Sequence, residues 1–282
     1  MIPSSVPVLD LRAADGARAR VLLDGAQVVS WIPAGGGDDR LFLSRNAEFG
    51  LGRSARGGIP ICFPQFGPFG ALPQHGFARN VRWTLRDASR REAGEVTLRL
   101  THVDVAAQRP AEEVASWPHP FALDATVQVA GNALVVQLVA TNTGRSPLTF
   151  TAALHPYFAV HEACATTVEG LSGLTYRDAL QGGALVHEEA SLLSITGALD
   201  RLYYDAPDVL ALREAVRTLR IEKRGFPDAV VWNPGAAITA SKRDFEAGDE
   251  GGMLCVEAAV VGRPVVLAPG EQWTGAQRMV AI

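Results

Sequence analysis

"FALDATVQVAGNALVVQLVATN", residues 121–142, decides the fold class of this chain. Apolar and polar residues alternate on both sides of Gly131-Asn132, as they do in two strands that each bury one face. A Gly-Asn pair tolerates the positive φ angles of a tight two-residue turn. The stretch therefore predicts an antiparallel β-hairpin.

Similar strand-like segments recur along most of the chain. Each is a short apolar or alternating run bounded by Gly, Pro, Asn or Asp, and they cover 19–32, 95–103, 148–158, 228–235 and 253–261. One segment competes for helix, because the first half of "DVLALREAVRTLRIEK" (208–223) has a helical composition. Since few helices separate the strands, we predict an all-β protein, a large antiparallel β-sandwich formed by residues 1–282 as one domain.

The composition fits a globular protein with a large core, because 48% of the 282 residues are hydrophobic and 20% are charged. A formal net charge of −4 gives no long-range attraction to nucleic acid or to an anionic membrane. The chain shows no signal-peptide pattern and no run near the ~18 apolar residues of a membrane span. We therefore expect a cytoplasmic protein with no nucleic-acid or membrane partner.

The three cysteines, Cys62, Cys164 and Cys255, are far apart and odd in number. This pattern disfavours a disulfide framework and lacks the paired spacing of a zinc site. This cysteine pattern fits a protein that resides in a reducing compartment.

A Gly/Pro-rich connection carries several polar candidates. It runs from "RGGIPICFPQFGP" (56–68) into "GALPQHGFARNVRW" (70–83) and holds Arg56, Gln74, His75 and Arg79. Its prolines fix φ and its glycines allow close backbone approach, so the loop is preorganised, as binding loops on a rigid scaffold often are. Composition alone is equally compatible with a surface crossover whose arginines are simply solvated.

Three further candidates come from strand-like segments. His155, in "ALHPYFAV" (153–160), ends an alternating run and precedes aromatic residues that would wall a cavity. Glu257 interrupts the apolar strand "MLCVEAAVV", where an unpaired carboxylate would be costly, and either a structural ion pair or catalysis would account for it. Asp200, in "GALDRLYYDAP" (197–207), would pass for a turn aspartate on its own. No role is assigned to the other histidines, His102, His119, His161 and His187.

A histidine and a glutamate on separate strands, with arginines and a glutamine on a rigid loop, suit acid–base chemistry on a polar anionic ligand. The chain contains no HExxH, CxxC, GxGxxG, P-loop or GxSxG pattern. This disfavours zinc proteolysis, dinucleotide binding, phosphoryl transfer from ATP and serine hydrolysis. Among the reaction classes considered, chemistry that needs no cofactor remains.

The motifs "RGGIPICFPQFG", "LPQHGFARNVRW", "HPYFAV", "LDRLYYDAP", "DAVVWNPG" and "CVEAAVV", in this order, resemble those of the glucose-6-phosphate 1-epimerases, or hexose-6-phosphate mutarotases, of the aldose 1-epimerase-like group. The resemblance implies a galactose-mutarotase-like sandwich that interconverts the α and β anomers of hexose 6-phosphates without a metal or other cofactor. We expect a monomer whose partner is this small molecule. Segment 103–117 matches no motif, and Pro156 stands where many relatives have threonine.

The resemblance also assigns roles. His155 is the general acid and Glu257 the general base, while the substrate is held by Arg56, Gln74, Arg79 and Asp200, with His75 lining the pocket. Anomer exchange requires the base to take the C1 hydroxyl proton while the acid protonates the ring oxygen, so that the C1–O5 bond opens and can close on the other face. Glu257 then starts ionised and His155 protonated. Arg56, Arg79 or both hold the phosphate through charge-assisted bonds.

Two alternatives stay open from the sequence. One is a mutarotase of unphosphorylated aldoses, and the other is a non-catalytic carbohydrate-binding or regulatory module on the same fold.

Overall fold

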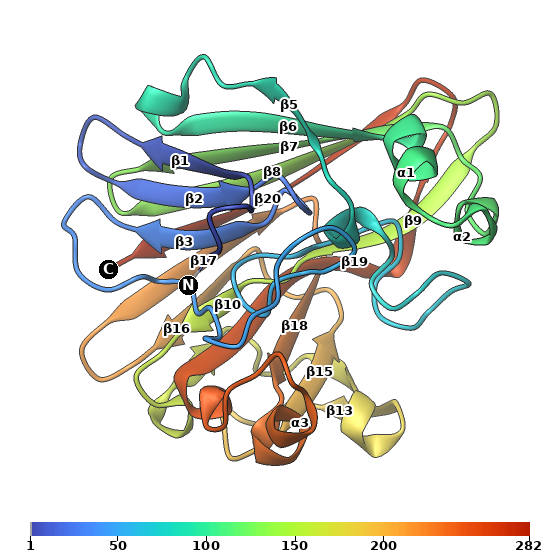
Figure 1. Cartoon of the computed structure of the whole chain (residues 1–282). Helices are drawn as coiled ribbons and strands as arrows, with labels where there is room; N and C mark the ends of the chain where they lie inside the picture. The colour runs from blue at the N-terminus through green and yellow to red at the C-terminus, as the bar shows by residue number, and fades with distance from the viewer. Residues whose placement is uncertain (1) are drawn as a thin grey trace.

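Two large antiparallel sheets lie face to face in the computed structural model, which describes residues 2–282 (Figure 1). The eight-stranded sheet has the order β13 (Ala184–His187), β12 (Thr175–Asp178), β15 (Leu199–Tyr203), β18 (Asp228–Asn233), β19 (Met253–Leu267), β9 (Leu148–Leu154) and β4 (Ile61–Cys62), and β10 (Tyr157–Ala159) also pairs with β19. The predicted mainly β sandwich is therefore confirmed.

The second sheet has nine strands, in the order β14 (Leu192–Ser194), β11 (Thr167–Glu169), β16 (Val209–Arg213), β17 (Thr218–Arg224), β20 (Gln272–Ala281), β8 (Ala133–Asn142), β7 (Phe121–Ala130), β6 (Glu95–Thr101) and β5 (Thr84–Asp87). A small third sheet holds β1 (Val8–Arg12), β2 (Arg18–Leu22) and β3 (Val28–Ile32). Three short α-helices, α1 (His102–Gln108), α2 (Ala111–Ala115) and α3 (Gly235–Ser241), lie at the edges. None of the helices within residues 2–282 is long and apolar enough to span a membrane.

The hairpin expected at 121–142 is formed by β7 and β8. Ala130 pairs with Ala133 across the Gly131-Asn132 turn, and buried residues alternate along both strands. The helix favoured for the first half of segment 208–223 is wrong, because the whole segment forms the hairpin of β16 and β17. Its buried apolar residues, Leu210, Leu212, Leu219 and Ile221, repeat every second position along each strand, and their burial in the sheet outweighs the helical propensity of Ala, Leu and Arg.

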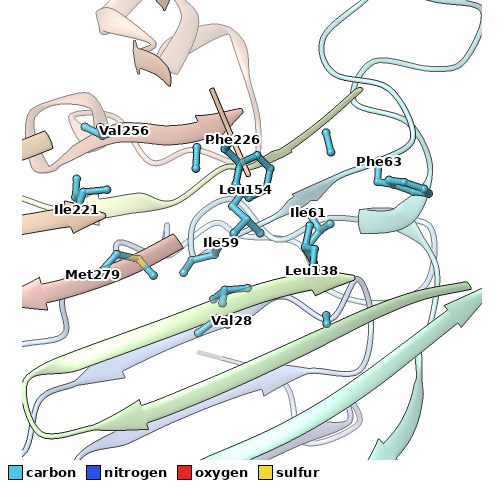
Figure 2. Close-up of a cluster of buried hydrophobic side chains, with 14 of the residues drawn as sticks. Val28, Ile59, Ile61, Phe63, Leu138, Leu154, Ile221, Phe226, Val256 and Met279 are labelled. Carbon is cyan, nitrogen blue, oxygen red and sulfur yellow. The ribbon is translucent and has the colours of Figure 1, made fainter. Parts of the chain in front are cut away.

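The Gly/Pro-rich segment contributes to the core rather than to the surface. Residues 57–67 are all buried, and Ile59, Ile61 and Phe63 point into the cluster between the two sheets (Figure 2). Gly57 and Gly58 have φ angles of 130° and 61°, and a Cβ on Gly58 would lie 2.1 Å from the Val28 carbonyl oxygen. Glycine is required at this point because the backbones approach too closely for a side chain.

This segment also holds the residues that carry the site. The backbone N–H of His155 donates to the Pro60 carbonyl at 3.0 Å, and that of Tyr157 donates to the Gly58 carbonyl at 2.8 Å. Segment 58–62 thus acts as an edge partner for the chain around His155. Its rigidity fixes where the histidine lies.

The unmatched segment 103–117 forms α1 and α2 and ends at Trp117. The Trp117 ring lies 5.8 Å from that of Phe63 and 6.1 Å from that of Phe77, both in the Gly/Pro-rich connection. Its Nε1 donates to the Thr149 carbonyl at 3.0 Å. The segment therefore supports the connection from behind.

Candidate active site

The polar candidates from separate strands meet on the outer face of the eight-stranded sheet, away from the nine-stranded one. Glu257 pairs with Val230, Val230 with Leu202, and Leu202 with Arg177, which forms one row across the sheet. The next row joins Asp200, Trp232, Cys255 and Tyr157. Directly paired residues share a face, so these two rows bring distant parts of the sequence together.

Above the two rows lies a cavity of about 520 Å³, lined by residues of β12, β15, β18, β19 and the Gly/Pro-rich connection. All seven sequence-predicted site residues line it: Arg56, Gln74, His75, Arg79, His155, Asp200 and Glu257. Four cationic side chains line it against two carboxylates. Although the chain is acidic overall, this cavity is locally suited to an anionic ligand.

His155 and Glu257 form the centre of the cavity. His155 Nε2 lies 3.3 Å from Glu257 Oε1, and the two side chains are only 8% and 1% exposed. Glu257 Oε2 and His155 Nδ1 are buried and have no hydrogen-bond partner within residues 2–282. Buried polar atoms without partners are rare in native proteins, and here they belong to a pair that borders a cavity.

Burial acts on both members of this pair. It raises the pKa of Glu257 well above the usual range, with Asp200 adding to the effect and Arg79 opposing it. It lowers the pKa of His155 well below the usual range, and His75, Arg79 and Arg56 lower it further. The substrate-free cavity therefore favours the uncharged form of each group, whereas the expected roles begin with a carboxylate and an imidazolium.

The two arrangements differ only by a proton moved across the 3.3 Å contact. In either one, one member of the pair can donate a proton and the other can accept one. A ligand that changes the local charge can therefore shift the equilibrium between the neutral and the charged forms of the pair.

His155 is also held by aromatic rings. The Tyr157 ring stacks on it at 5.0 Å and 14°, and the rings of Trp232 and His75 meet it edge-on at 5.8 Å and 5.6 Å. Pro156 therefore does not displace this histidine from the cavity. Of the two aromatic residues expected to wall the cavity after His155, Tyr157 does so, whereas Phe158 lies in the main core.

His75 is a neutral hydrogen-bonding group rather than a cation. Its Nδ1 accepts from the Gly67 N–H at 3.3 Å, and burial, Arg79 and Arg56 lower its pKa to about 3. Nε2 must then carry the proton. Because Gln74 Nε2 lies 3.3 Å from this N–H, we assign the Gln74 amide in the reverse orientation, with its oxygen accepting from His75 and its NH₂ group available to a ligand.

Asp200 lies on β15 beside the pair. Burial, with a contribution from Asp178, raises its pKa to about 6. A carboxyl group in this state can both accept and donate hydrogen bonds near neutral pH, which suits the recognition of sugar hydroxyls.

The two predicted arginines have different environments. Arg56 is bonded to Asp244 and Tyr157, whereas the buried Nε of Arg79 has no partner within residues 2–282. Arg79 does use one terminal nitrogen, which donates to the Gln74 carbonyl at 3.0 Å. Both arginines line the same cavity as His155, and the positive charge of each lowers the pKa of its imidazole.

Sequence reasoning missed several residues of the cavity, chiefly Arg177, Trp232, Lys242 and Phe245. Strand alternation could have found Trp232, since it lies two residues from Val230 and faces the same side. Arg177 and Lys242 carry no local signal. Only the order of the strands and the fold of the loop after α3 bring them to the cavity.

Comparison with known proteins places this fold in a family of sugar epimerases. The aldose 1-epimerase family model matches residues 7–280. The chain therefore belongs to the aldose 1-epimerase family, as the motifs predict.

More specific relatives carry a narrower name. A Cenchrus ciliaris protein named "Putative glucose-6-phosphate 1-epimerase" is 35% identical over 99% of this chain and 86% of its own length. An Escherichia coli (strain K12) protein of the same name is 32% identical over 86% of this chain and 79% of its own.

Solved structures give the same fold. A crystal structure described as a "putative mutarotase" from Salmonella typhimurium superposes with a TM-score of 0.86 and 27% identity, covering 99% of this chain and 92% of that one. A galactose mutarotase-like protein from Lactobacillus casei reaches a TM-score of 0.76 at 16% identity, over 98% and 100% of the two chains. The galactose-mutarotase-like sandwich is thus confirmed.

Proposed function

We propose that this protein interconverts the α and β anomers of hexose 6-phosphates, chiefly glucose 6-phosphate. One observation carries the proposal: a buried histidine and glutamate, 3.3 Å apart and with unpartnered polar atoms, border a cavity lined by four cationic side chains. The curated relatives named for glucose 6-phosphate support the same substrate.

The reaction needs an acid and a base at two neighbouring atoms. The C1 hydroxyl oxygen and the ring oxygen O5 are bonded to the same carbon, so groups 3.3 Å apart can reach both. Glu257 takes the C1 hydroxyl proton while His155 protonates O5, and the C1–O5 bond opens to the aldehyde. Rotation about C1–C2 and ring closure invert C1, and both groups regain their starting states. Each group contributes on the order of 10²–10⁴ in rate.

The phosphate group prepares the acid for this step. Arg56 and Arg79 both lower the pKa of His155, and a phosphate dianion bound to them offsets their charges. Binding therefore raises the pKa of His155 towards the protonated form. Arg79 also stabilises the Glu257 carboxylate, so in the complex this carboxylate depends on hydrogen bonds from the sugar and on the nearby imidazolium.

Gln74 and Asp200 hold sugar hydroxyls, and His75 fixes the orientation of Gln74. The distribution of charge favours phosphorylated over free sugars. A mutarotase of unphosphorylated aldoses would need no more than the acid, the base and hydroxyl-binding groups.

The test is NMR exchange spectroscopy on equilibrated glucose 6-phosphate, which follows magnetisation transfer between the α and β C1 protons. We expect acceleration by the protein, a loss of at least 10²-fold in Glu257→Gln, and much weaker acceleration for glucose. Equal acceleration of both sugars would favour the free-aldose enzyme. Saturable shifts of the C1 resonances without exchange would instead identify a carbohydrate-binding module.

A further inference from the structure

Arg56 is held on several sides before any ligand arrives. Its Nε and Nη2 donate to Asp244 Oδ2 at 3.1 and 2.9 Å, and its Nη1 donates to the Tyr157 hydroxyl at 3.0 Å. The guanidinium also lies 4.7 Å from the centroid of the Phe245 ring. A guanidinium has five N–H groups, so one N–H on each terminal nitrogen remains for a ligand.

Asp244 itself is well placed to act as a fixed support. The next residue, Phe245, is buried in a cluster with Tyr157, Met253 and Cys255. The Phe245 backbone carbonyl accepts from Asn46 Nδ2 at 2.9 Å, which ties this segment to the chain on its other side. Asp244 is therefore attached to rigid neighbours, although its own side chain is 22% exposed.

Asp244 does not line the cavity, whereas Arg56 and Phe245 do. Its carboxylate makes contact with the cavity through Arg56, to which it is hydrogen-bonded. An arginine side chain loses much rotamer freedom when a ligand fixes it, and a partner that fixes it beforehand removes this cost from binding.

We infer that Asp244 is a positioning residue for phosphate recognition, holding Arg56 so that its two remaining N–H groups meet the phosphate of the sugar. The inference rests on the proposed function, in which Arg56 binds that phosphate. It predicts that loss of Asp244 weakens the binding of phosphorylated sugars selectively.

The test compares Asp244→Ala and Asp244→Asn on glucose 6-phosphate and on glucose, by the same NMR exchange measurement. Asp244→Ala should raise KM for glucose 6-phosphate about tenfold, the scale of losing hydrogen bonds to a charged group, and change kcat less than about threefold. Its kcat/KM for glucose should stay within about twofold of the wild type. Asp244→Asn retains an acceptor oxygen and should restore most of the affinity. Asp244→Ser, too short to reach Arg56, serves as a second truncation if the alanine variant folds poorly.

Several results would overturn the inference. Equal losses on both sugars, with no rescue by asparagine, would mean a purely structural role. A lower KM in Asp244→Ala would mean that the carboxylate competes with the phosphate. Arg56→Ala distinguishes a failure of the proposed phosphate-binding role of Arg56 from a failure of the inference about Asp244. If it leaves KM for glucose 6-phosphate unchanged, the proposed role of Arg56 fails. If it raises KM while Asp244→Ala does not, only the inference about Asp244 fails.

Discussion

The two faces of β19 are equally buried but differ in chemistry. Leu254, Val256 and Ala258 belong to the core between the sheets, whereas Cys255 and Glu257 lie on the opposite face, where Glu257 lines the cavity, and all five are at most 1% exposed. The inner face removes apolar surface from water and so stabilises the fold. The outer face buries a carboxylate whose raised pKa shows that its charge is disfavoured. Because side chains alternate along the strand, one face of β19 supplies core packing and the other carries the proposed catalytic carboxylate.

The largest expected effect tests the outer face. Glu257→Gln removes the proposed base, so kcat for anomer exchange should fall at least 10²-fold. The pKa of Glu257 is higher in the folded than in the unfolded protein. The free energy of unfolding therefore falls as pH rises from the unfolded-state pKa through the folded-state pKa. The variant should therefore have a Tm at pH 8 equal to or above that of the wild type, as measured by calorimetry. If Glu257→Gln instead lost both activity and several degrees of Tm, the outer face would also contribute to stability, and the contrast between the two faces would fail.

The matched change on the inner face is Leu254→Ala. Truncating a fully buried leucine should lower the free energy of unfolding by about 2–5 kcal/mol, because it loses apolar burial and leaves a cavity. Denaturant titration measures this loss. At a temperature where the variant is folded, we expect kcat to stay within about threefold of the wild type, since the site lies on the opposite face. Loss of catalysis in the folded variant would mean that the two faces are coupled.

A third comparison sets the segment that supports the site against a simple turn. Alanine at Gly58 would place a Cβ 2.1 Å from the Val28 carbonyl oxygen, whereas a Cβ at Gly131 would have no atom within 4 Å among residues 2–282. Both glycines have positive φ, which alone costs about 1–2 kcal/mol with a side chain. Gly131→Ala should show this cost and Gly58→Ala at least about twice as much, by denaturant titration.

Gly58→Ala should also reduce catalysis more than Gly131→Ala, since the Gly58 and Pro60 carbonyls hold the chain around His155. Equal activity in the two folded variants would show that this segment does not set the position of His155, the proposed acid.

How much of this the sequence could predict depends on how local the signal is. The hairpin at 121–142 was predictable because alternation and the Gly131-Asn132 turn both act locally. Segment 208–223 was not, because its helical composition is overridden by a sheet that depends on distant strands.

The same distinction holds for the site. Glu257 and His155 were recognisable as polar interruptions of apolar runs, and the motifs carried the loop residues. Arg177 and Asp244 were not recognisable, since their relevance comes from strand order and from a contact between Asp244 and Arg56, 188 residues apart. Neither the strand order nor this contact leaves a local pattern in the sequence.

The smallest expected effect concerns the second carboxylate of the cavity. Burial raises the folded-state pKa of Asp200 to about 6, above that of the unfolded chain, so its contribution to stability is lost as pH rises through about 6. Asn mimics the protonated form, and because the side chain is partly exposed the gain is small. Asp200→Asn should therefore exceed the wild-type Tm by about 2–4 °C at pH 8, and the difference should close by pH 4.

Asp124→Asn is the control for this measurement. Asp124 is paired with Arg99 at 2.6 Å and with Arg86 at 2.7 Å on the other sheet, so its replacement removes two ion pairs and should not raise Tm at any pH. If Asp200→Asn behaved like Asp124→Asn, the carboxylate of Asp200 would be satisfied in the folded state. Of the two cavity carboxylates, Glu257 alone would then reduce the free energy of unfolding. The proposed base would also be the residue that destabilises the fold.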